Sequence, residues 1–290
     1  SVDLKIKLPA MKLNNLILVP TDFSEVCKNA IDFAVKVGEM LKFDVCIYHV
    51  INKESEKLFD GENVKELVEK NLIALQEEFA AKTSLEIQYA YEEGSIFDLI
   101  HHKAQQIGAN LIVLGTHGKK GMQRLFGSFA LKVITRAQVP TLVVQKKPFK
   151  SVKKFLFPVN SFTEARQKVN YAITIGKVFD AEMVIYKEKV KDSTDQNRLE
   201  IITKQIVEAF KKEGIRYSVE VAESAGESAK LLISQAVEKN MDMIMIVTEP
   251  QVGSSHFSVG PWNEKIMFNE AQIPVLCINP VEHSNVYFDF

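Results

Sequence analysis

The sequence predicts an α/β protein built from two tandem open five-stranded parallel sheets flanked by helices. The first observation is an internal repeat, because residues 17–50 align without a gap on residues 155–188, with Pro20 on Pro158 and Gly38 on Gly176. The second is that short β-branched runs alternate with amphipathic segments in both copies, as parallel βαβ units require. The third is that runs such as residues 111–115 are apolar on successive residues, which is typical of central parallel strands covered on both faces.

The elements of the first copy follow from this alternation. We expect strands near 15–20, 44–50, 85–90, 110–115 and 140–144, and helices near 25–41, 59–82, 96–107 and 127–137. The Lys-rich stretch 145–154 contains Pro148 and no periodicity, so it is predicted to be the linker. The two predicted domains are therefore residues 1–150 and 151–290.

Composition and charge narrow the class of protein. In 290 residues, hydrophobic residues make up 46% and charged residues 25%, the balance of a globular chain that can bury a sizeable core. The 36 basic and 37 acidic residues nearly cancel, so no overall positive field favours nucleic acid or anionic lipid as a partner. No apolar stretch is long enough for a membrane span, and we expect a cytoplasmic protein.

Metal and disulfide chemistry have little support in the sequence. Cys27, Cys46 and Cys277 show no pair spacing. His117 has neither an acidic partner nor a second histidine at a ligand spacing. We therefore expect no metal site and assign no catalytic residue.

Two loops are expected to meet where a ligand would bind. In open parallel sheets, ligands bind beyond the carboxyl ends of the strands, where the strand order reverses. Pro20, Thr21 and Asp22 follow the first predicted strand. The Asp22 carboxylate could accept a hydrogen bond from a ribose hydroxyl or an adenine amine, and it could equally cap the helix that starts at Ser24 or Glu25.

The second loop, after the predicted strand 110–115, is rich in glycine. Gly115 and Gly118 allow backbone amides to approach an anion closely, and Gly127 and Ser128 then open a helix. A helix N-terminus offers free N–H groups and a positive dipole end, and Ser128 could add a hydroxyl or serve as the N-cap. A glycine-rich turn alone is a weak signal, but its position opposite the first loop favours a triphosphate site.

At these residues the sequence resembles the universal stress protein family, whose ATP-binding members carry Gly, two residues, Gly, about nine residues, then Gly and Ser or Thr. Here Gly118 and Gly127 are separated by eight residues, one fewer than in that pattern. The resemblance extends through both copies and implies an adenine nucleotide alpha hydrolase-like fold with strand order 3-2-1-4-5. It also implies ATP or another adenine nucleotide as ligand, with or without Mg²⁺. The implied contacts are Pro20, Thr21, Asp22 and the backbone of Val50 for adenine and ribose, and Gly115, Gly118, Gly127, Ser128 and the Phe129 amide for phosphate.

The second copy departs from this pattern. Val247 and Pro250 stand at the positions of Gly115 and Gly118, Asn160 at that of Asp22 and Pro261 at that of Ser128, whereas Gly260 persists. Proline has no N–H to donate, and a valine where positive φ is needed would be strained. We expect the second copy to be a degenerate module that does not hold phosphate in the same way.

Three functions remain open at this stage. One is a stress-response protein that binds an adenine nucleotide in its first domain without dedicated catalysis. A second is a slow ATPase or nucleotide hydrolase, although no hydrolytic base is identifiable, and a third is an interaction scaffold without nucleotide. Because family members commonly pair through their last strands, strands 140–144 and 274–278 are expected to lie side by side, which would cover two apolar edges. The sequence leaves open whether the whole chain forms a homodimer.

Overall fold

The computed structural model describes residues 14–59, 63–117, 125–160, 168–225, 229–250, 257–258 and 260–279. The first half contains, in order, β1 (Leu16–Pro20), α1 (Glu25–Leu41), β2 (Asp44–Ile51), α2 (Lys53–Leu58), α3 (Val64–Ala80), β3 (Ile87–Glu93), α4 (Ile96–Ile107), β4 (Ala109–Gly115), α5 (Leu125–Arg136) and β5 (Thr141–Val144). The second half contains β6 (Lys154–Val159), α6 (Val169–Phe179), β7 (Glu182–Lys189), α7 (Ser193–Lys212), β8 (Tyr217–Ala225), α8 (Ala229–Glu238), β9 (Met243–Val247), β10 (Glu249–Pro250), β11 (Phe257–Ser258), α9 (Gly260–Met267) and β12 (Val275–Ile278).

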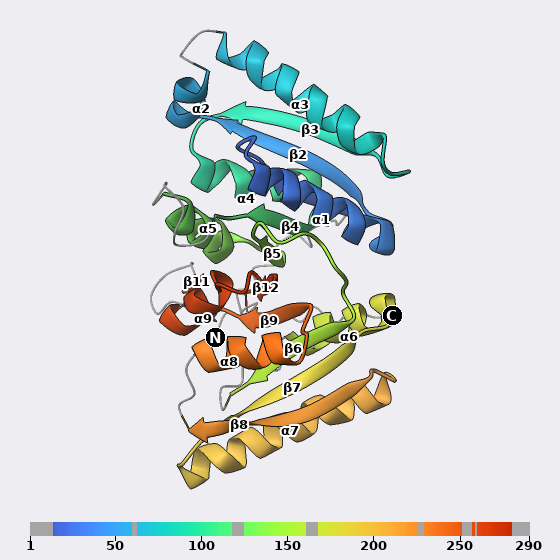
Figure 1. Cartoon of the computed structure of the whole chain (residues 1–290), viewed down its shortest axis with the longest axis vertical. Helices are drawn as coiled ribbons and strands as arrows, with labels where there is room; N and C mark the ends of the chain where they lie inside the picture. The colour runs from blue at the N-terminus through green and yellow to red at the C-terminus, as the bar shows by residue number, and fades with distance from the viewer. Residues whose placement is uncertain are drawn as a thin grey trace, which may run out of the picture.

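The two five-stranded sheets join into one ten-stranded sheet that runs through the long axis of the molecule (Figure 1). Its order is β3-β2-β1-β4-β5-β12-β9-β6-β7-β8, so each half has the predicted order 3-2-1-4-5. All neighbours within each half are parallel. The halves meet through β5 and β12, which pair antiparallel with Leu142 opposite Leu276. The predicted fold class and the predicted pairing of the two last strands are confirmed.

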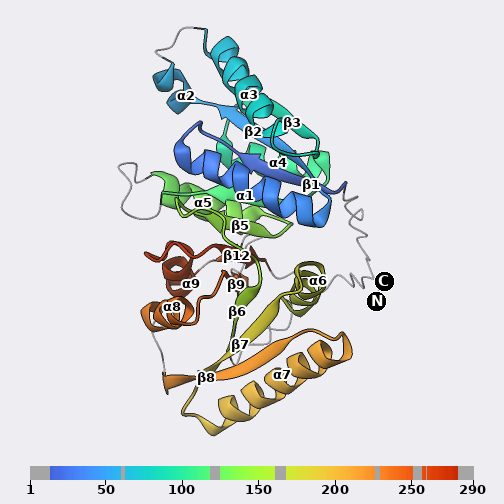
Figure 2. The ribbon, with the colours of Figure 1, turned by 45° about the vertical axis from the view of Figure 1, so that its right-hand side comes forward.

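Helices cover both faces of the sheet, which explains the continuous apolar runs of its strands. One hydrophobic cluster gathers buried residues of α1, α3, α6 and α7 against one face, and a second gathers those of α4, α5, α8 and α9 against the other. Figure 2 shows α1 and α3 on the same side of the first half. In each half, therefore, the first two crossovers use one face and the later ones use the opposite face.

Polar side chains tie the two halves together beside the β5–β12 pair. Gln145 follows β5 and donates from Nε2 to the Asn269 carbonyl at 2.9 Å. Asn279 follows β12 and donates from Nδ2 to the carbonyls of Ile134 at 2.6 Å and Ala137 at 2.7 Å. Each half thus sends one side chain across the junction to backbone of the other, as in an isologous interface between two copies.

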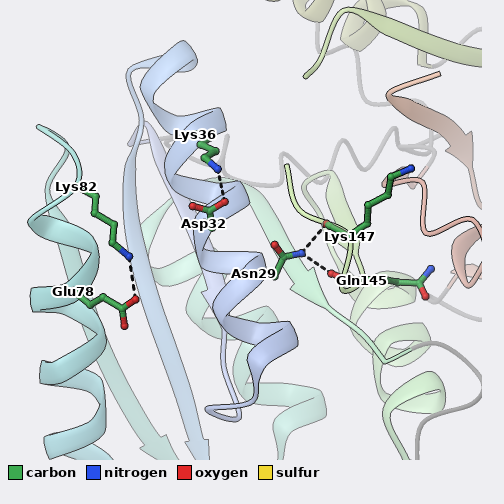
Figure 3. Close-up of polar contacts among 7 residues, drawn as sticks. All are labelled: Asn29, Asp32, Lys36, Glu78, Lys82, Gln145 and Lys147. Atoms are coloured by element: carbon green, nitrogen blue, oxygen red, sulfur yellow. Dashed lines mark hydrogen bonds and ion pairs between the residues drawn. The ribbon is translucent and has the colours of Figure 1, made fainter. Parts of the chain in front are cut away.

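The segment after β5 is also fixed against α1. Asn29 on α1 donates from Nδ2 to the carbonyls of Gln145 at 2.6 Å and Lys147 at 3.0 Å (Figure 3). Figure 3 also shows the ion pairs Lys36–Asp32 on α1 and Lys82–Glu78 on α3. The start of the predicted linker is therefore attached to the first half by hydrogen bonds from the Asn29 side chain before β6 begins.

The predicted helix 59–82 starts too early, because α3 begins only at Val64 and a separate short helix, α2, ends before residue 59. Asn52 caps the short α2 by accepting from the N–H groups of Glu54 and Ser55, and the Ser55 hydroxyl accepts from the N–H of Asn52. This reciprocal capping box starts a helix that ends at Leu58, and α3 begins separately at Val64. The Asn-x-x-Ser capping signal of α2 is present in the sequence. The amphipathic pattern of α3 is stronger, and the prediction followed that pattern.

Candidate functional site

The candidate site lies at the carboxyl edge of β2, β1 and β4, which are neighbours in the sheet. The chain leaves β1 toward α1 on one face and leaves β4 toward α5 on the opposite face. Helices α1 and α5 consequently cover opposite faces of the sheet. This is the topological switch point at which open α/β sheets bind ligands.

The loop after β1 is held by its own side chains. Pro20 ends β1 and is buried, and Thr21 donates its N–H to the Tyr48 carbonyl at 2.8 Å. The Thr21 hydroxyl accepts from the Phe23 N–H at 3.0 Å. These bonds fix the direction in which the chain leaves the sheet, and Phe23 adopts a positive φ of 68° within the turn.

Asp22 is partly exposed and shapes the turn before α1. Its Oδ1 accepts from the N–H of Ser24 at 2.9 Å, and Ser24, not Asp22, is the N-cap of α1. The expected start of α1 at Glu25 is confirmed, but the capping role belongs to Ser24. Asp22 therefore presents a negative charge at the switch point from a rigid turn.

His49 lies beneath this loop, and the sequence analysis did not select it. It is only 4% exposed, its Nδ1 lies 2.7 Å from the Thr21 carbonyl, and its Nε2 lies 2.8 Å from the Ser55 hydroxyl. The Phe23 ring stacks on it at 4.6 Å between centroids. Burial lowers the pKa of His49, so the imidazole is neutral at physiological pH. A polar residue within the apolar run of β2 is the signal that could have identified it.

Val50, the next residue of β2, is buried. Tyr48 directs its carbonyl toward β1, and alternate residues of a strand direct their carbonyls to the same side, so the Val50 carbonyl also faces the β1 side. The chain after β1 does not continue alongside Val50, because the N–H of Phe23 donates to the Thr21 hydroxyl within the turn. The Ser55 hydroxyl lies 3.4 Å from the Val50 carbonyl.

Gly115, at the end of β4, has a packing role that the sequence analysis did not foresee. A Cβ at this position would lie 2.8 Å from the Val26 carbonyl of α1. The φ of Gly115 is not positive, so the strain expected for Val247 at the matching position of the second half is wrong. Glycine is required here because α1 crosses closely over β4. Gly118 lies outside the described residues.

Helix α5 begins at Leu125, two residues earlier than predicted. Ser128 therefore lies inside the first turn and is not the N-cap, because apolar Leu125 and Phe126 already belong to the helix. Gly127 and Phe129 flank Ser128 in the same turn. The first turn of a helix supplies free N–H groups, so the start of α5 remains the part of this connection suited to a phosphate.

The second half differs at the same edge. Lys168, directly before α6, is 2% exposed and donates from Nζ to the carbonyls of Pro158 and Met245, the latter at 3.2 Å. Its Nζ also lies 4.2 Å from the centre of the Phe157 ring. Pro158 belongs to β6 and Met245 to β9, so the side chain bridges the two strands that form the second switch point. Burial lowers the pKa of Lys168 to about 7.

The connection after β9 also departs from that of the first half. β10 and β11 pair antiparallel, with Glu249 opposite Ser258 and Pro250 opposite Phe257. Gly260 and Pro261 are the first two residues of α9, where proline is well tolerated. Two short antiparallel strands thus follow β9 at the point of the sequence where the first half carries its glycine-rich segment.

The described residues also bear on other classes of site. They contain no group of three or more His, Cys, Asp or Glu side chains that could hold a metal ion. Among them, no helix is both long and apolar enough to cross a membrane. All three cysteines are buried and free.

Comparisons with known proteins place the chain in a family. The sequence model of the universal stress protein family matches residues 14–145. Universal stress protein MJ0531 of Methanocaldococcus jannaschii is 33% identical over 138 residues, which cover 45% of this chain and 81% of that protein. Universal stress protein MJ0577 of the same organism is 29% identical over 156 residues, covering 45% of this chain and 94% of that protein.

A solved structure matches both halves together. The crystal structure of a universal stress protein from Archaeoglobus fulgidus superposes with a TM-score of 0.72 at 18% identity, covering 92% of this chain and 99% of that one. At this identity the likeness shows the fold. The 33% identity with MJ0531 over 81% of that protein, together with the match of the family model, shows that the chain belongs to the universal stress protein family.

Proposed function

We propose that the protein is a stress-response protein that binds ATP or another adenine nucleotide at the switch point of its first half, without dedicated catalysis. The observation that carries this proposal is the rigid turn after β1, which presents the Asp22 carboxylate at the carboxyl end of β1, where α1 and α5 cover opposite faces of the sheet. A carboxylate at the end of a β-strand can accept the hydroxyl protons of a ribose. The half-molecule 1–150 would be the nucleotide-binding domain and 151–290 a degenerate domain.

The residues of the first half fit an adenine nucleotide in part. Thr21, Asp22 and the Val50 carbonyl offer polar groups beside the buried Pro20, which suits a flat base attached to a sugar. Gly115 does not contribute an open cradle, because the space of its missing Cβ is occupied by the Val26 carbonyl. Phosphate binding therefore depends on Gly118 and on the N–H groups at the start of α5. Mg²⁺, where bound, would neutralise phosphate charge there.

The second half supports the proposal by contrast. Its switch point already holds the Lys168 Nζ between two backbone carbonyls. Asn160 replaces Asp22, and two short antiparallel strands follow β9 in place of the glycine-rich segment. We therefore assign one nucleotide to each chain. The cytoplasmic location expected from the sequence is part of this proposal.

The test compares thermal unfolding with and without millimolar Mg-ATP for the natural protein and three variants. A ligand at a hundredfold excess over its dissociation constant stabilises the native state by about 2.7 kcal/mol. We expect a rise in Tm for the natural protein that is lost in Asp22→Ala and in Gly118→Val/Ser128→Ala.

Asp192→Ala is the matched control. Asp192 accepts from the Thr194 N–H at 2.9 Å at the start of α7, as Asp22 does from Ser24, but it lies in the second half. This variant should keep the full ATP-dependent rise. Absence of any rise in the natural protein would refute nucleotide binding and favour an interaction scaffold.

A further inference from the structure

His49 joins two parts of the candidate site that are separate in the chain. Its ring bonds to the Thr21 carbonyl in the loop after β1 and to the Ser55 hydroxyl of α2. Both are short contacts, and the ring is buried beneath Phe23. The side chain cannot shift without moving the loop, the helix or both.

The contacts of the ring determine which of its nitrogens carries the proton. The Thr21 carbonyl can only accept a hydrogen bond, so Nδ1 of His49 carries the proton. In the neutral ring Nε2 is then an acceptor, and it accepts a hydrogen bond from the Ser55 hydroxyl at 2.8 Å. Burial lowers the pKa of His49 and thus supports this neutral form.

This arrangement affects the Val50 carbonyl. The Ser55 hydroxyl has one proton and three acceptors within reach: His49 Nε2 at 2.8 Å, the Val50 carbonyl at 3.4 Å and Asn52 Oδ1 at 3.5 Å. Nε2 of His49 is the nearest of the three and accepts the hydrogen bond from the Ser55 hydroxyl. The Val50 carbonyl, which faces the β1 side beyond the end of the β1 ladder, is thereby left as an acceptor for an N–H donor.

We propose that His49 is a positioning residue of the nucleotide site, which fixes the Thr21–Asp22 loop and keeps the Val50 carbonyl available to the amino group of the base. This inference rests on the proposed function. It assigns His49 no contact with the nucleotide, because the residue acts through Thr21 and Ser55.

The second half lacks this connection. Lys187 stands at the matching position of β7, at the repeat offset of 138 residues from His49, and its Nζ pairs with Glu200 of α7 at 2.5 Å. The histidine bridge therefore occurs in the half that keeps Asp22 and Gly118 of the family pattern. The second half has lost both the histidine and the residues that match Asp22 and Gly118.

The experiment measures ATP affinity by calorimetric titration in His49→Asn, His49→Asn/Ser55→Ala and Lys187→Asn. Asparagine keeps a donor near the position of Nδ1 but does not reach Ser55. The Ser55 hydroxyl then donates its hydrogen bond to the Val50 carbonyl or to Asn52 Oδ1. We expect His49→Asn to weaken ATP binding about tenfold, the effect of losing one hydrogen bond to the ligand. The added Ser55→Ala change removes the competing proton, so the double variant should bind within about threefold of the natural protein. Lys187→Asn should bind as the natural protein does.

Two outcomes would overturn the role of His49: ATP affinity unchanged in His49→Asn, or a double variant as weak as the single one. A merely structural role for His49 predicts the latter, since a second truncation in the same core would add to the damage.

A separate readout needs no nucleotide. In ¹⁵N-labelled protein at pH 7, the imidazole resonances absent from His49→Asn should show the neutral form with the proton on Nδ1. A proton on Nε2, or on both nitrogens, would overturn the inference. If the natural protein fails to bind ATP, the proposed function fails, and these resonances still decide whether the His49 bridge exists.

Discussion

Replacing Lys168 by methionine should change how the stability of the protein depends on pH. The side chain is 2% exposed, and burial lowers its pKa from 10.5 to about 7. That difference corresponds to about 5 kcal/mol by which the folded state disfavours the ammonium relative to the unfolded chain. Methionine keeps much of the length of lysine and suits a site beside Phe157 and Met245.

The sign follows from proton binding. Between pH 7 and 10.5 the unfolded chain holds a proton on Lys168 that the folded chain has largely released. Raising the pH therefore favours the folded state, and this contribution is lost as the pH falls toward 7. From pH 7 to pH 9 the free energy of unfolding of the natural protein should rise by about 2 kcal/mol more than that of Lys168→Met.

Urea unfolding followed by circular dichroism at pH 7, 8 and 9 measures this difference. In Lys168→Met the carbonyls of Pro158 and Met245 lose the hydrogen bonds from Lys168, which lowers the free energy of unfolding. This loss does not depend on pH, so it does not alter the slope of the free energy of unfolding against pH. Lys204→Met is the control, because the Lys204 side chain is 78% exposed on α7, and its curve should run parallel to that of the natural protein. Parallel curves for Lys168→Met and the natural protein would refute a lowered pKa at Lys168.

Three further predictions concern stability, each measured as the free energy of unfolding in urea. Gly115→Ala should lower it by about 1–3 kcal/mol, because the new Cβ would lie 2.8 Å from the Val26 carbonyl, and an unchanged value would show that α1 moves freely. Asn279→Ala should lower it by about 1–3 kcal/mol, since the carbonyls of Ile134 and Ala137 lose the hydrogen bonds that Asn279 donates across the junction, and no loss would mean that this contact does not hold the halves together. Phe210→Ala should lower it by about 3–5 kcal/mol, because the ring is fully buried against Phe157, and a loss below 1 kcal/mol would contradict the packing described for α7.

The sequence predicted the sheet well because the repeat and the apolar runs report burial directly. The offset of 138 residues that aligned Pro20 with Pro158 also relates the starts of β1 and β6. The pairing of β5 with β12 was expected from the family resemblance, and its physical reason is the apolar edge that each strand would otherwise expose.

The details of the site were harder to predict, because they depend on contacts between distant segments. Gly115 is explained by an α1 carbonyl nearly ninety residues earlier in the chain, and a glycine at the end of a strand gives no sign of such a neighbour. Lys168 binds carbonyls of two different strands, which no local pattern reveals. Its alignment with Ala30, a fully buried residue of α1, was the available indication that this lysine is buried.

The number of ATP molecules bound per chain is the most direct test of the central claim. That claim is that the first half binds a nucleotide and that Lys168 occupies the corresponding place in the second half. Equilibrium dialysis at saturating Mg-ATP measures it on the intact 290-residue protein. One ATP per chain, abolished by Asp22→Ala and retained in Asp192→Ala, is the predicted result. Two per chain would contradict the closure of the second switch point by Lys168, and none would contradict nucleotide binding altogether.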